Sequence, residues 1–253
     1  LNVITKINSS AVTEEFVNQN LHKTWIIFNF SALDDRVKIN LAKKVKYSIV
    51  EYDYKICKHR SLDLHKAIEE EECDCINEGM EGKIKQLFYG YAQKIWFMSE
   101  AQRQIFLDKV ASIKKERTEV LSSVFLEGDL RFIQSISDNN KNSKFIILNS
   151  NSWIKGTRDS ILYAKQNNLD FELVKDLKYH ELLIKLSTSK GLIFRPLGGD
   201  TCPRIVIEAK LLGCELLMNE NVQHKDEPWF DNKETIMNYL NERIQTFWSF
   251  YEK

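Results

Sequence analysis

The chain has 253 residues, of which 43% are hydrophobic and 11% aromatic, and its 36 lysines and arginines balance 36 acidic residues. This composition is typical of a folded globular protein, and it excludes disorder, low-complexity repeats and the large basic face of a nucleic-acid-binding protein. The length suits two small domains or one large domain.

Short apolar runs, rich in β-branched and aromatic residues, alternate with longer helical patterns along the whole chain. This alternation is typical of an α/β protein in which helices cover a parallel sheet. The predicted strands are 25–30, 47–54, 94–98, 119–125, 145–149, 171–174, 191–195 and 214–219. The predicted helices are 13–21, 61–72, 83–93, 100–117, 157–167, 179–186, 203–212 and 234–251.

The polar stretch 137–143 cannot bury apolar surface, and it separates two series of strand–helix units. We therefore predict one domain over 1–137 and a second over 138–253. The last predicted helix, 234–251, carries more aromatic residues than a terminal surface helix needs, so we expect it to pack back on the first domain.

Charge and cysteine patterns bear on partners and compartment. The basic cluster at 38–46 and the acidic run at 69–72 are interpreted as solvated helix faces, although the basic cluster leaves a peripheral membrane contact open. No run approaches the ~18 apolar residues of a spanning helix, and the first residues lack a signal-peptide pattern. Five irregularly spaced cysteines favour reduced thiols. We expect a soluble cytoplasmic protein that does not bind nucleic acid.

Two loops in the second half carry candidate ligand-binding residues. Lys155 and Gly156 follow the predicted strand 145–149, where loops of an open parallel sheet meet a ligand. The second loop contains Gly198 and Gly199, which let the backbone approach a ligand closely, and it leads into a helix whose N-terminus favours an anion such as a diphosphate. A solvated lysine and a tight loop without a ligand are the competing interpretations.

Asp200 lies in the second loop, and Glu208 lies in the helix that follows it. An acid inside an otherwise apolar helix is costly unless it faces a polar ligand or partner. We favour contact of Glu208 with a ligand over a buried structural salt bridge.

These residues resemble the retaining glycosyltransferases of the GT-B fold, of the large family 4 type (glycosyl transferases group 1). The C-terminal domain of that family typically has a Lys-Gly pair after its first strand and a loop–helix motif of two acids separated by seven residues. Lys155-Gly156 matches the pair, and Asp200 through Glu208 matches the motif, with Asp replacing the usual first Glu. The resemblance implies two Rossmann-like domains with parallel sheets, of which the N-terminal one looks reduced or truncated.

By this resemblance the catalytic residues are Lys155 on the donor diphosphate, Glu208 on the ribose hydroxyls and Asp200 on the transferred sugar. Many members carry an arginine near the position of Asn149 and Ser150, so Arg204 or Arg158 is expected to supply the second positive charge. The other residues implied for donor binding are Gly198, Gly199, Thr201, Cys202, Arg204, Lys175, Asp176 and Leu177.

The implied reaction moves a sugar from a nucleotide sugar to the hydroxyl of a glycan, lipid or small-molecule acceptor, with retention and without a metal or other cofactor. Fixed positive charge can stabilise the diphosphate that leaves. Asp53, near the end of the predicted strand 47–54, and Arg60, just beyond that strand, are the acceptor-side candidates.

Two alternative functions belong to other classes of protein. The chain could be a non-catalytic nucleotide-sugar-binding protein. It could also be a GT-A-like, metal-dependent glycosyltransferase, because Glu51 and Asp53 share one face of a strand and two carboxylates can bind a divalent ion.

Cysteines and a histidine also gather in the first half. Cys57, His59, Cys73 and Cys75 could form a zinc site, but their C-x-H and C-x-C spacings depart from the common C-x₂₋₄-C pattern. We therefore expect ordinary packing or surface residues here.

Overall fold

The computed structural model describes residues 4–252. The chain forms two compact units, Leu1–Val120 and Leu121–Lys253. This division precedes the polar stretch 137–143 at which the sequence places the domain boundary. The reason is that α6 (Glu127–Ser135), which comes before that stretch, packs against α9 (Arg204–Leu211) of the second unit.

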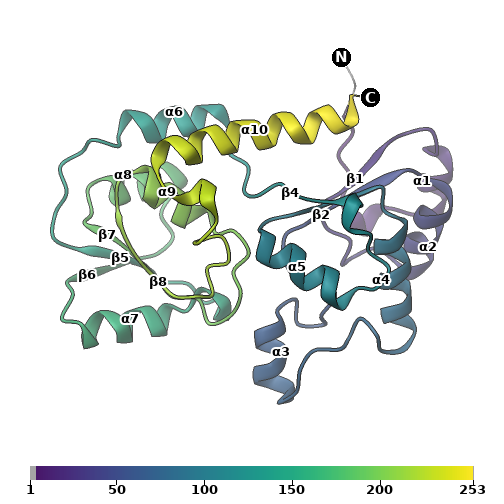
Figure 1. Ribbon diagram of the computed structural model, residues 1–253, viewed down its shortest axis with the longest axis horizontal. Helices are drawn as coiled ribbons and strands as arrows, with labels where there is room; N and C mark the ends of the chain where they lie inside the picture. Colours follow the sequence, from purple (N-terminus) through teal and green to yellow (C-terminus); the bar gives the residue numbers. More distant parts are fainter. Residues whose placement is uncertain (1–3, 253) are drawn as a thin grey trace. The chain divides into compact units, whose positions relative to one another are not determined.

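The first unit contains a parallel four-stranded sheet with the order β1-β2-β3-β4. Because the chain crosses this sheet in one direction, right-handed crossovers place the connecting helices on the same face, where α2 packs against α4 (Figure 1). Its strands are β1 (Trp25–Ile27), β2 (Tyr47–Glu51), β3 (Lys94–Phe97) and β4 (Thr118–Val120). Its helices are η1 (Ser9–Ala11), α1 (Glu14–Gln19), α2 (Asp35–Lys44), α3 (Leu62–Glu69), α4 (Gly79–Tyr91), α5 (Glu100–Lys109) and η2 (Lys115–Arg117).

Aromatic rings form much of the core of the first unit. Tyr47 stacks on Phe88 with 4.9 Å between ring centroids, and Phe30 packs edge-on against Phe88 and Tyr89. Burying each large apolar side chain stabilises the fold by about 1.5–3 kcal/mol. This aromatic core therefore stabilises the sheet whose strand ends carry the loops of the first unit.

The second unit contains a parallel sheet with the order β6-β5-β7-β8. The strand order reverses beside β5, so α7 lies on one face and α8 and α9 lie on the other (Figure 1). The strands are β5 (Phe145–Leu148), β6 (Phe171–Val174), β7 (Gly191–Phe194) and β8 (Glu215–Met218). Besides α6 and α9, the helices are η3 (Trp153–Lys155), α7 (Thr157–Gln166), α8 (Tyr179–Ser187), η4 (Pro228–Phe230) and α10 (Lys233–Tyr251).

Each of the eight predicted strands and eight predicted helices is present, nearly all of them with shifted ends. The largest shift among the strands is in the prediction 119–125, which overlaps β4 only at its first two residues. The predicted helix 100–117 is too long, since α5 ends at Lys109, where the fully buried Val110 leaves the helical conformation. The sequence patterns also missed α6. Lys38 is not solvated as predicted: it is buried on α2 and its Nζ lies 2.8 Å from Asp35 Oδ1.

The last helix, α10, belongs to the second unit, where it packs on η4 and α9. Its expected packing on the first domain stays a prediction. No helix within residues 4–252 combines the length and the apolar character that crossing a membrane requires.

Candidate functional site

The loops that follow β5 and β7 lie directly against each other in the second unit. Gly156 has a φ of +57°, and a Cβ atom at this position would lie 1.8 Å from the carbonyl oxygen of Arg195. The Leu197 N–H also donates a hydrogen bond to the Ile154 carbonyl at 3.1 Å. Only glycine permits this approach, which fixes Lys155 next to the loop after β7.

Lys155 and Asp200, which the sequence places on separate loops, form an ion pair with 2.7 Å between Nζ and Oδ2. The same ammonium lies over the ring of Phe194, 5.6 Å from its centroid. The backbone holds Asp200 from both sides, because its N–H donates to Asn221 O at 2.8 Å and its carbonyl accepts from Gln223 N–H at 3.1 Å. The pair is therefore formed between two well-fixed loops.

Glu208 lies on the inner side of α9 and is 3% exposed. Its Oε1 accepts a hydrogen bond from the Tyr179 hydroxyl at 2.9 Å and lies 3.4 Å from Arg204 Nε. Burial raises the pKa of Glu208, and the contacts with Tyr179 and Arg204 oppose that rise. The guanidinium of Arg204 in turn rests on the Phe125 ring and lies 3.7 Å from Asp129 Oδ2.

Lys155, Arg204 and Glu208 line one cavity of about 420 Å³, whereas Asp200 is not part of its lining. Its size falls in the range of small-molecule sites, and it lies at the carboxyl end of β5, beside the point where the strand order reverses. Ligands of open α/β sheets bind at such points. The residues that line it are Asp129, Leu148, Lys155, Tyr179, Leu182, Pro203, Arg204, Ile205 and Glu208.

Several residues expected to bind the donor do not line this cavity. Gly198, Thr201 and Cys202 are buried, and Gly199 is partly buried in the loop before α9. The Cys202 thiol contacts the Ser122 hydroxyl at 3.5 Å, and burial raises its pKa to about 11. If this loop contacts the donor, the contact would therefore be made by backbone atoms.

The loop expected to grip the nucleotide base lies at the same edge of the sheet. Lys175, Asp176 and Leu177 follow β6 and are exposed outside the lining of the cavity. Of the two arginines suggested as a second cation, Arg204 lines the cavity, whereas Arg158 is exposed on α7 and does not.

Sequence reasoning missed Tyr179 and Asp129. Tyr179 is the first residue of α8, so its position after a strand at the carboxyl edge was a usable signal. Asp129 comes from α6, which the sequence patterns did not predict, and its approach to Arg204 depends on packing between elements far apart in sequence.

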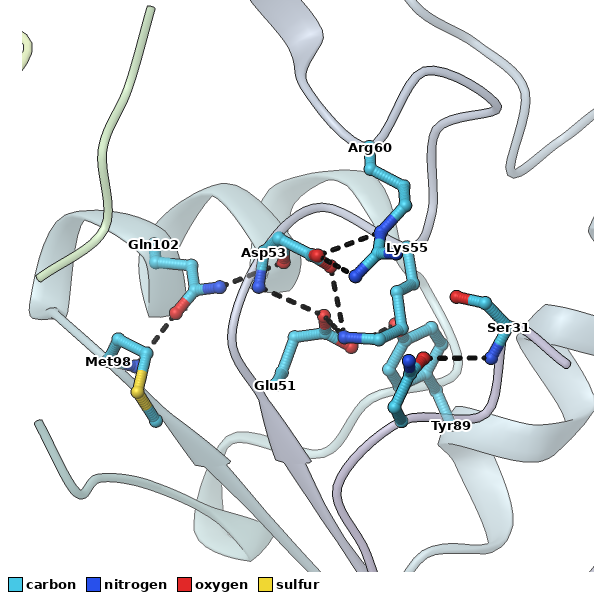
Figure 2. A network of polar contacts seen from close by, with 9 residues as sticks. Ser31, Glu51, Asp53, Lys55, Arg60, Tyr89, Met98 and Gln102 are labelled. Atoms are coloured by element: carbon cyan, nitrogen blue, oxygen red, sulfur yellow. Dashed lines mark hydrogen bonds and ion pairs between the residues drawn. The ribbon is translucent and has the colours of Figure 1, made fainter. Parts of the chain in front are cut away.

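The first unit holds a separate polar network at the carboxyl end of β2 (Figure 2). Glu51 is fully buried; its Oε1 lies 2.7 Å from Lys55 Nζ, and its Oε2 accepts a hydrogen bond from the Tyr89 hydroxyl at 2.6 Å. Lys55 also lies 2.9 Å from Asp53 Oδ1. Burial raises the pKa of Glu51, and Lys55 counteracts that rise.

Asp53 and Arg60, the acceptor-side candidates, are ion-paired in this network (Figure 2). The carbonyl of Asp53 also accepts a hydrogen bond from Gln102 Nε2 at 2.9 Å. The Lys55 ammonium bridges the carboxylates of Glu51 and Asp53. These two acids are therefore already paired with a cation, which does not favour the GT-A-like metal site.

No protein-family model matches this sequence, and a search of curated proteins finds no match. Solved structures do share its architecture. Sucrose-phosphate synthase from Thermosynechococcus elongatus has a TM-score of 0.56 at 9% identity, covering 92% of this chain and 68% of that chain. Anabaena HepE in complex with UDP has a TM-score of 0.51 at 13% identity, covering 91% of this chain and 71% of that chain. At these identities the likeness concerns the fold alone: the chain has a GT-B fold, with two Rossmann-like units whose parallel sheets each have four strands.

Proposed function

We propose that this protein is a glycosyltransferase that transfers a sugar from a nucleotide sugar to an acceptor hydroxyl. The observation that carries this proposal is the convergence of Lys155, Arg204 and Glu208 on one cavity at the switch point of the second sheet. HepE, which shares the fold, was solved with UDP, and this makes UDP the first nucleotide to test.

The cavity residues divide into two groups that suit the two polar parts of a nucleotide. Lys155 and Arg204 offer positive charge to a diphosphate, and ionised partners make hydrogen bonds roughly twice as strong as neutral ones. Glu208 offers carboxylate oxygens to ribose hydroxyls. In the free protein Lys155 is paired with Asp200, so a bound phosphate would replace this carboxylate as the partner of Lys155.

The Lys155-Gly156 pair and the Asp200–Glu208 motif support a reaction like that of retaining family 4 enzymes. In that reaction the bond between the sugar C1 and the diphosphate oxygen breaks, C1 bonds to the acceptor oxygen on the same face, and the proton of the acceptor hydroxyl passes to the departing diphosphate. Lys155, Arg204 and the N-terminus of α9 would stabilise the departing diphosphate. We therefore expect transfer without a metal at this site.

The acceptor is proposed to meet the first unit near Asp53 and Arg60. The Arg60 side chain is about half exposed, so it can contact a glycan, a lipid headgroup or a small molecule. None of the five cysteines, all of which lie within residues 4–252, forms a disulfide, which supports action in the reducing cytoplasm.

Asp200→Asn tests the reaction itself. If Asp200 positions the transferred sugar, this substitution should lower the rate of transfer at least tenfold, because its contact strengthens as charge develops on the sugar. Affinity for UDP should stay the same or rise, since the variant removes a carboxylate that competes for Lys155. Asp200→Glu should be the milder change.

The measurement is the rate of sugar transfer and of donor hydrolysis beside the affinity for UDP. Asp226→Asn is a matched control, because Asp226 is an exposed acid of the same unit. An Asp200→Asn protein that transfers sugar at the wild-type rate would exclude this residue from the mechanism. A wild-type protein that binds the donor but neither transfers nor hydrolyses it would be the non-catalytic binder.

A further inference from the structure

Three cysteines and one histidine converge in the segment between β2 and α4 of the first unit. The Sγ atoms of Cys57, Cys73 and Cys75 and a ring nitrogen of His65 all lie within 4.8 Å of one another. The Nδ1 atom of His65 is 3.6 Å from the Sγ atoms of both Cys57 and Cys75. Four potential metal-ligand atoms from one segment of the chain therefore converge on a common point.

The spacing of these atoms fits a tetrahedral zinc ion. Zinc bonds of about 2.3 Å to sulfur and about 2.0–2.1 Å to nitrogen, at the tetrahedral angle, place the nitrogen about 3.6 Å from each sulfur. The two nitrogen–sulfur distances have this value. Little movement of the backbone would be needed to bind the ion.

Burial distinguishes this cluster from reactive surface thiols. Cys57, His65 and Cys73 are 2%, 3% and 4% exposed. Within residues 4–252, Nε2 of His65 has no hydrogen-bond partner, and the two sulfurs are the polar atoms that its Nδ1 meets. Thiols are weak hydrogen-bonding partners for a buried imidazole, whereas thiolates and an imidazole together are a common ligand set for zinc.

The surrounding backbone holds the cluster in place. Cys57 Sγ accepts a hydrogen bond from the His59 N–H at 3.3 Å, and the Cys73 carbonyl accepts one from Lys109 Nζ at 3.1 Å. A Cβ atom at Gly82 of α4 would lie 2.9 Å from the Cys75 carbonyl oxygen. The backbone at Cys75 therefore packs closely against α4.

We propose that Cys57, His65, Cys73 and Cys75 bind one Zn²⁺ ion. Four protein ligands leave no open position, which is the arrangement of a structural site rather than a catalytic one. The sequence alone grouped His59 with the three cysteines. In the structure His59 is not part of the cluster, because its Nε2 lies 2.7 Å from Glu69 Oε1. Helix α3 supplies His65 in its place.

A zinc ion here would fix the loop that carries the acceptor-side candidates. The Cys57 N–H donates to the Tyr54 carbonyl at 2.9 Å, and the Arg60 N–H donates to the Cys57 carbonyl at 3.1 Å. Cys57 thus connects the metal to the loop that presents Asp53 and Arg60. The nucleotide cavity of the second unit shares none of these residues.

The test is the zinc content of the full chain, measured by elemental mass spectrometry after expression with added zinc and purification under reducing conditions. We expect one zinc per chain. Cys57→Ser, Cys73→Ser, Cys75→Ser and His65→Ala should each lose zinc to a competing chelator at least tenfold more readily. His65→Cys should retain zinc, because four cysteines form another common zinc site.

Two controls separate this site from general damage to the protein. His59→Ala removes the nearby histidine, and Cys214→Ser removes a buried cysteine of the second unit; both should keep the wild-type zinc content. If the ligand variants fail to fold, wild-type protein stripped with a chelator and loaded with Co²⁺ should show the charge-transfer absorption of cobalt–thiolate bonds. Removing the metal should also lower the melting temperature.

Wild-type protein that carries no zinc and, after reduction, shows no cobalt–thiolate absorption would overturn the proposal. A disulfide within the cluster in protein that takes up no metal after reduction would overturn it in favour of a redox pair. Equal retention of zinc by His65→Ala and His59→Ala would also contradict it.

Discussion

Lys155→Ala should weaken the binding of UDP by about 10- to 100-fold and leave the binding of uridine unchanged. A hydrogen bond to a charged group contributes about 1.5–3 kcal/mol, which corresponds to this range. The variant also leaves the Asp200 carboxylate without its lysine, and this negative charge would repel the diphosphate. Only the diphosphate presents the charge that Lys155 neutralises, so the two ligands should respond differently.

Calorimetric titration of the wild type and the variant with both ligands measures this effect. Lys165→Ala is the matched control, because Lys165 is an exposed lysine of α7, the helix that follows Lys155. Equal losses for UDP and uridine would mean that Lys155 supports the fold of the site rather than the diphosphate. No loss for UDP would place its diphosphate elsewhere.

His224 should make the protein less stable in acid. Its fully buried ring stacks on Trp229 with 5.4 Å between centroids, and it meets Phe230 edge-on at 4.7 Å. Within residues 4–252 neither ring nitrogen has a hydrogen-bond partner. Burial lowers the pKa of His224 to about 3, because the charged imidazolium would lose its hydration.

The sign of the effect follows from proton binding. The unfolded chain binds a proton at His224 with an ordinary pKa of about 6.5, while the folded protein keeps the ring neutral down to about pH 3. The unfolded state therefore binds more protons between these values, and the free energy of unfolding falls as the pH falls through this window. From pH 7.5 to 4.5, the titration of His224 should lower the free energy of unfolding by roughly 2–3 kcal/mol.

Urea denaturation of the wild type and of His224→Phe at the two pH values checks this prediction. Other titrating groups contribute equally to both proteins, so the difference between them isolates His224. His180→Phe is the control, because the His180 side chain is 59% exposed, and this variant should keep the wild-type pH dependence. If His224→Phe loses stability between pH 7.5 and 4.5 as steeply as the wild type does, the buried ring is not the cause.

The strands and the positions of the two site loops could be predicted from local sequence. Short apolar runs identify buried strands, and each of the two site loops follows one of these runs. Lys155 could be selected before its contacts were known, because ligands bind beyond the carboxyl ends of parallel strands. Glu208 could be selected because an acid inside an apolar helix is costly without a polar partner.

Contacts between distant elements could not be predicted in this way. The pairing of Lys155 with Asp200 depends on how two loops meet, and Asp129 reaches Arg204 because α6 packs against α9, a helix far away in the sequence. The histidine of the cysteine cluster was misassigned for a similar reason. The sequence grouped His59 with the cysteines because it is two residues from Cys57, but α3 begins after its Ser61 N-cap and directs His65 toward the sulfurs.

The most direct test of the proposed donor site is a crystal structure of the full chain with bound UDP. We predict that the diphosphate lies within hydrogen-bonding distance of Lys155 Nζ and that the ribose hydroxyls contact the Glu208 carboxylate. Asp200 should then no longer be the partner of Lys155. UDP bound away from the cavity between β5 and α9, or an unchanged Lys155–Asp200 pair beside bound UDP, would contradict this account.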